Sequence, residues 1–123
     1  MNQEAVERGL QPVASIPERI QAFVESGLPK RLLAETFDVS PQTITNWQEG
    51  VAKPRPANRT TIDDIRFVME ILIAKGLQAD QAANIVGRRF NEPPHERFIE
   101  FIRRDPDGAI ERISKLRPRH PSA

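Results

Sequence analysis

Residues 30–50, KRLLAETFDVSPQTITNWQEG, constrain the fold most strongly, because start and stop signals for two helices follow one another closely there. Asp38 lies between two helix-forming segments, and aspartate tolerates the left-handed backbone of a tight turn better than most residues. Ser40 is suited to cap the second segment, Pro41 fits its first helical position, and Gly50 is suited to end it. The stretch therefore predicts two short helices joined by a tight turn.

The apolar residues of this stretch fit two packed helices, expected over 30–37 and 41–49. The side chains expected to face inward are Leu33, Ala34, Val39, Ile44 and Trp47. Gln42, Thr45 and Asn46 then fall on the outer face of the second helix. This pattern predicts a helix-turn-helix, although another kind of small three-helix packing unit is an alternative.

The segment LAETFDVSPQTITNWQEG resembles the Cro/C1-type (Xre family) repressor motif, which is commonly LAxxLGVSxxTISxWExG. The matching positions are Leu33, Ala34, Val39, Ser40, Thr43, Ile44, Trp47 and Gly50. Two features depart from the motif: Asp38 replaces the usual turn glycine, and Gln48-Glu49 replaces the usual Glu-Asn/Lys. The resemblance implies an all-α, lambda repressor-like helix-turn-helix bundle with additional C-terminal helices. It also implies that helix 41–49 enters the major groove of DNA.

The contacts expected with DNA follow from that placement. A Gln or Asn side-chain amide can bond bidentately to adenine, and a threonine methyl can contact thymine. The residues expected to contact bases are Pro41, Gln42, Thr45 and Asn46. In the family, the loop after this helix follows the phosphate backbone, and here residues 51–59 hold three cations and no acid. The residues expected to contact phosphates are Lys30, Arg31, Thr43, Lys53, Arg55 and Arg59. A solvated loop that happens to be basic is the alternative for residues 51–59.

The composition restricts the other functional classes. The 123 residues are enough for one domain, and their net charge of +1 means that DNA binding requires a local basic surface. The chain has no cysteine and no tyrosine, and its two histidines lack partners at metal-ligand spacing. No apolar run approaches the length of about 20 residues that crosses a membrane. We therefore expect no enzyme activity, no metal, no cofactor and no membrane contact, and a cytoplasmic, nucleoid-associated location.

Apolar spacing predicts further helices on either side of the motif, at about 17–26, 60–75, 79–90, within 95–104 and from 106 to 116. Two prolines predict irregular backbone over 51–59. Thr61 and Asp64 are expected to form a capping box at the start of the helix that follows. The predicted core face of that helix comprises Ile62, Ile65, Val68, Met69, Leu72 and Ile73, with Phe67 and Ile71 widening its apolar surface.

The expected domain organisation has four parts. They are a flexible N-terminal arm (1–14), a helix-turn-helix DNA-binding domain (15–75), a C-terminal helical extension (76–116) and a basic tail (117–123). The segments IDDIRFVMEILIAKG and RFIEFIRRDPDGAIERI are similar, more loosely, to the tails of some Xre-like regulators, including antitoxins. In those proteins such a tail carries dimer or toxin contacts.

The hypothesis that the sequence favours is a sequence-specific transcriptional regulator, a repressor, that binds double-stranded DNA as a homodimer. Two alternatives stay open. One is an antitoxin that represses its own operon and binds a partner toxin. The other is an accessory protein of DNA packaging or transposition.

Overall fold

The computed structural model describes residues 15–116, and every regular element in that range is a helix. The seven helices are α2 (Ile16–Ser26), α3 (Lys30–Phe37), α4 (Pro41–Glu49), α5 (Pro56–Ala74), α6 (Ala79–Gly87), α7 (Phe98–Arg104) and α8 (Pro106–Ser114). The all-α class predicted from the sequence is therefore confirmed over the described range. The predicted arm (1–14) and tail (117–123) lie outside it.

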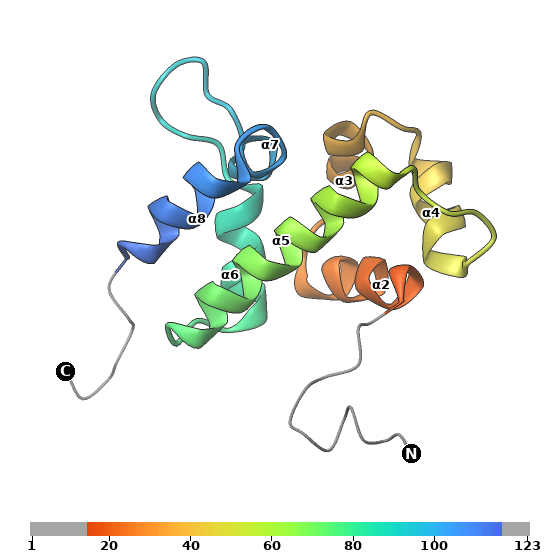
Figure 1. Cartoon of the computed structure of the whole chain (residues 1–123), viewed down its shortest axis with the longest axis horizontal. Coiled ribbons are helices and arrows are strands. Elements are labelled where there is room, and N and C mark those ends of the chain that lie inside the picture. Colours follow the sequence, from red (N-terminus) through yellow and green to blue (C-terminus); the bar gives the residue numbers. More distant parts are fainter. Residues whose placement is uncertain (1–14, 117–123) are drawn as a thin grey trace.

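Helix α5 runs through the middle of the molecule, with α2, α3 and α4 toward one of its ends and α6, α7 and α8 toward the other (Figure 1). Ile62, Ile65, Val68 and Leu72 of α5 are fully buried, so one apolar core follows this helix. The predicted core face of α5 is confirmed except at its last member, because Ile73 is 44% exposed. No helix between residues 15 and 116 has the length and apolar character to span a bilayer.

The predicted start of α5 is wrong by four residues. The helix begins at Pro56, not at residue 60, because proline is well suited to the first helical position, where no donor is needed. Thr61 consequently lies within the helix and is buried in the protein. Its hydroxyl donates to the Ala57 carbonyl (3.2 Å) instead of capping the start of the helix. Asp63 and Asp64 lie in the interior of α5, so the predicted capping box does not form.

The predicted end of α6 is also wrong. The helix ends at Gly87 although the apolar spacing continues to Phe90. Contacts from the following segment explain the early end: the Arg97 guanidinium donates to the Gly87 carbonyl (2.8 Å), and the Phe90 amide donates to the Glu96 carbonyl (2.9 Å). Half-buried Phe90 instead packs edge-to-face on Phe98, with ring centroids 5.8 Å apart.

Polar side chains also join helices that are distant in the sequence. Arg19 of α2 is only 6% exposed and pairs with Asp63 of α5. Burial is the main cause that lowers the pKa of Arg19 below its usual value. Arg103 of α7 donates to the carbonyl of Thr36 near the end of α3. The helices after α5 are therefore in direct contact with the α3–α4 part of the molecule.

Candidate nucleic-acid interface

The turn between α3 and α4 forms for local reasons. Asp38 adopts the left-handed conformation (φ 58°, ψ 49°), which reverses the chain after α3. The Val39 amide then donates to the Ala34 carbonyl (2.9 Å) and satisfies one of the last acceptors of the helix. The Ser40 hydroxyl caps α4 by accepting from the Thr43 amide (3.1 Å). Asp38 therefore permits the tight turn that the sequence predicted.

A compact core lies beneath this turn. Leu33, Ala34, Ile44 and Trp47 are buried as the sequence predicted, whereas Val39 is half-buried. Phe37, which the sequence analysis did not assign to this core, packs edge-to-face on Trp47 with ring centroids 5.5 Å apart. Its burial could have been predicted from its position four residues after Leu33, because residues at this spacing share one helix face. These contacts fix the orientation of α4 relative to α3.

The outward face of α4 carries the predicted base-contacting side chains. Pro41 and Gln42 are exposed, and Thr45 and Asn46 are half-buried. Two contacts organise this face. The Gln42 side-chain amide donates to the Asn46 Oδ1 atom (3.0 Å), and Lys30 Nζ of α3 donates to the Thr45 hydroxyl (3.2 Å). The structure thus brings a predicted phosphate contact, Lys30, directly beside a predicted base contact, Thr45.

A groove of about 480 Å³ lies beside the start of α4. Its lining includes Thr43 and the two exposed cations Lys53 and Arg55 from the segment between α4 and α5. Arg103 of α7 lines the same groove, although the sequence placed it in a separate extension. Arg103 and Thr36 are 67 residues apart in the sequence, so no local pattern could have revealed their contact. Thr43, Lys53, Arg55 and Arg103 therefore form one groove, which we call the cationic groove.

The two remaining predicted cations are placed differently. Arg59 is exposed in the first turn of α5 and, with Lys53, lines a second hollow of about 240 Å³ next to Gly50. Arg31 is exposed on α3, and no hydrogen bond joins it to the other predicted residues within the described range. The structure therefore connects Lys53 with both Arg55 and Arg59 and leaves Arg31 apart from them.

The positive charge of the surface around α4 depends on whether its cations pair with carboxylates. The ion pairs found among residues 15–116 are Arg19–Asp63, Arg66–Glu70, Arg104–Glu96 and Lys115–Glu111. None of them involves a predicted phosphate contact or Arg103, so these cations form no direct ion pair within this range, although the exposed carboxylate of Asp38 also lines the cationic groove. Unpaired, exposed guanidinium and ammonium groups attract a polyanion at long range and lose this attraction as salt is added.

Comparison with protein-family models, curated proteins and solved structures finds no match to this chain. The chemistry of the surface is therefore the available guide to its function. Residues 15–116 contain no cluster of three or more side chains that would hold a metal ion. The outer face of α4 carries amide and hydroxyl side chains that can form hydrogen bonds, and cationic side chains lie beside them.

Proposed function

We propose that this chain is a helix-turn-helix, lambda repressor-like protein that binds double-stranded DNA sequence-specifically and represses transcription. The observation that carries the proposal is the amide pair on the outer face of α4, exposed Gln42 and half-buried Asn46, flanked by cations that form no ion pair within residues 15–116. Helix α4 would enter the major groove, which has the width to admit a helix and displays a distinct hydrogen-bonding pattern for each base pair.

The amide pair supports base recognition in a specific way. Because the Gln42 amide nitrogen donates to Asn46 Oδ1, the Gln42 carbonyl oxygen and the Asn46 amide nitrogen keep capacity for other partners. Together they supply one acceptor and one donor, which is the complement of the donor and acceptor that adenine displays in the major groove. Thr45 adds a methyl group that suits the methyl of thymine, and Pro41 lies at the entry of the helix.

The cations around α4 support contacts with the phosphates on either side of the DNA major groove. Lys53, Arg55 and Arg103 line the cationic groove, and Arg59 lines the second hollow together with Lys53. Phosphate contacts of this kind supply affinity and fix the register of a protein on the duplex without selecting a sequence. We include Arg103 in this set, which gives the helices after α5 a part in DNA binding.

One recognition helix contacts few base pairs, so the proposal includes a homodimer on a two-fold symmetric site. The centres of the two half-sites would lie roughly 34 Å apart, which is one turn of the duplex. A dimer bound across a promoter would exclude polymerase, which is the basis for proposing repression. The proposed location is therefore the cytoplasm, on the nucleoid.

The proposal is tested by removing the amide pair. A binding site is first selected from random duplex DNA with the full chain. The affinity of Gln42→Ala/Asn46→Ala is then measured for that site and for a scrambled duplex. The expected result is loss of about 1–3 kcal/mol of discrimination for each bidentate contact removed, with weak, salt-sensitive binding retained.

Gln48→Ala is the matched control, because Gln48 is also an amide of α4 but donates to Gln21 of α2 instead of facing outward. This variant is expected to keep its preference for the selected site. Unchanged preference in the Gln42→Ala/Asn46→Ala variant would refute the assignment of α4 as the recognition helix.

A further inference from the structure

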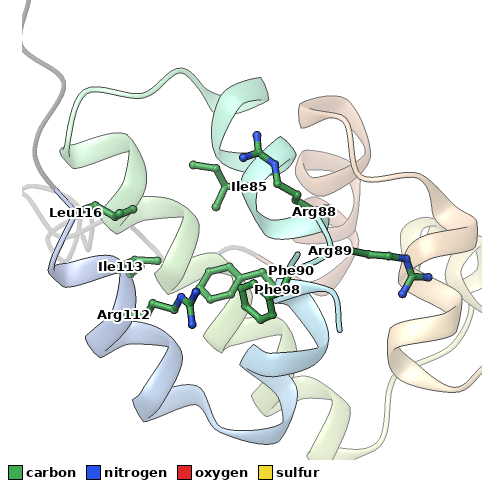
Figure 2. Close-up of a pocket in the computed structure, with 8 residues that line it drawn as sticks. All are labelled: Ile85, Arg88, Arg89, Phe90, Phe98, Arg112, Ile113 and Leu116. Carbon is green, nitrogen blue, oxygen red and sulfur yellow. The ribbon is translucent and has the colours of Figure 1, made fainter. Parts of the chain in front are cut away.

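A second surface with a different chemistry lies between α6, α8 and the segment that follows α6. It is a pocket of about 190 Å³ whose walls include the rings of Phe90 and Phe98 and the aliphatic side chain of Ile113 (Figure 2). The side chains of Ile85 on α6 and of Leu116, which follows α8, complete the apolar lining. An apolar cavity of about 150 Å³ is large enough to bind benzene, so this pocket has room for a ring-sized apolar group.

The polar side chains of the pocket are all arginines, namely Arg88, Arg89 and Arg112, and no carboxylate is among the lining residues. Figure 2 shows Arg112 on α8 reaching toward the two aromatic rings, whereas the guanidinium of Arg89 points away from them. The Arg112 guanidinium carbon lies 4.5 Å from the centroid of the Phe90 ring. Arg88 donates to Asn84 (2.7 Å), which uses only part of its capacity of five donors.

Arg112 differs from Arg104, which also stacks on a phenylalanine in the described part of the chain. Arg104 lies 4.9 Å from the Phe101 ring centroid, and its charge is met by Glu96 at 2.8 Å. Arg112 has the same kind of ring contact, but its guanidinium takes part in no ion pair or hydrogen bond within residues 15–116. A guanidinium that is oriented by a ring at the edge of an apolar pocket, with its donors available, is suited to bind a carboxylate in bidentate geometry.

We propose that this pocket binds a small organic anion, composed of one ring-sized apolar group and a carboxylate. The apolar group would lie against Phe90, Phe98 and Ile113, and the carboxylate would accept hydrogen bonds from Arg112, with Arg88 adding positive charge at the rim. A pocket with apolar walls and one or two placed polar groups is the usual form of a small-molecule site. This inference does not depend on DNA binding.

Phenylacetate is the probe, because it joins a benzene ring to a single carboxylate. It is titrated into the full chain without DNA, and the backbone amide resonances are followed by two-dimensional NMR. Saturable shifts are expected at residues 85–90 and 112–116. Phenylacetamide, which keeps the ring without the charge, and acetate, which keeps the charge without the ring, are each expected to bind at least about tenfold more weakly.

Arg112→Gln is expected to raise the dissociation constant of phenylacetate at least about tenfold, because a hydrogen bond to a charged group is lost. Arg104→Gln is the matched control, since it removes an arginine that stacks on a phenylalanine outside the pocket; it is expected to leave the constant unchanged. Shifts that do not saturate, that spread over the surface, or that respond equally to both variants would overturn the proposal. Equal binding of phenylacetate and phenylacetamide would overturn it as well.

Discussion

The two positively charged surfaces found among residues 15–116 differ in which side chains lie beside the charge. Around α4, the cations Lys53, Arg55 and Arg103 surround a groove next to amide and hydroxyl side chains. At the α6–α8 pocket, arginines border phenylalanine rings and aliphatic side chains. Charge spread along a polar face suits an extended polyanion, whereas charge at the edge of an apolar pocket suits a compact anion with an apolar part. Arginine therefore lies in two different chemical settings around one apolar core.

The largest effect is expected from Trp47→Ala, which removes the support of the α4 surface. Trp47 is 3% exposed and packs on Phe37, so the substitution should cost about 3–5 kcal/mol of unfolding free energy. Urea unfolding followed by circular dichroism measures it, because the variant lacks the only tryptophan. Phe67→Ala is the control: this aromatic residue is 47% exposed, and its loss should cost far less. A neutral Trp47→Ala variant would contradict the core described here.

A smaller effect distinguishes the two neighbouring arginines of α7. Arg103→Gln should weaken DNA binding on all sequences and reduce the slope of log affinity against log salt by about 1, as expected for one lost phosphate contact. Arg104→Gln changes the same charge on the adjacent residue, but Arg104 pairs with Glu96 and does not line the cationic groove. Its slope should match that of the parent chain. Equal slopes for Arg103→Gln and the parent would remove Arg103 from the proposed interface.

The smallest effect concerns Asp64, where α5 faces α8. Burial first, and the carboxylate of Asp107 second, raise the pKa of Asp64 above its usual value. Because the unfolded chain ionises Asp64 at the usual pKa, the folded state loses stability as the pH rises through the raised folded value. Asp64→Asn should therefore increase the melting temperature at neutral pH, with a gain that disappears in acid, below the usual pKa of an aspartate. An equal gain at every pH, or a loss at neutral pH, would contradict this account.

The sequence predicts the α3–α4 part of the molecule better than the part after α5. Asp38, Ser40 and Gly50 determine turns and helix ends through their own backbone and side-chain chemistry, so their effects can be inferred locally. The end of α6 at Gly87 depends instead on Arg97 and Glu96, which reach it only in the folded structure. An apolar period that continued to Phe90 carried no information about those contacts.

The same distinction applies to the candidate sites. The outward position of Gln42 follows from helix spacing, and the cations of residues 51–59 are evident in the sequence. Arg103 lines the cationic groove only because α7 packs against α3, and this tertiary contact is not visible in the sequence. The α6–α8 pocket likewise joins rings and arginines from separate elements, so no spacing rule could have placed them together.

The central claim is that α4 holds Gln42 and Asn46 outward in order to select a DNA sequence. Selection of bound duplexes from a random pool by the full chain tests it most directly. The expected result is enrichment of one motif with two-fold symmetric half-sites whose centres are roughly 34 Å apart. A pool that remains random after repeated rounds, together with no complex at low ionic strength, would contradict it.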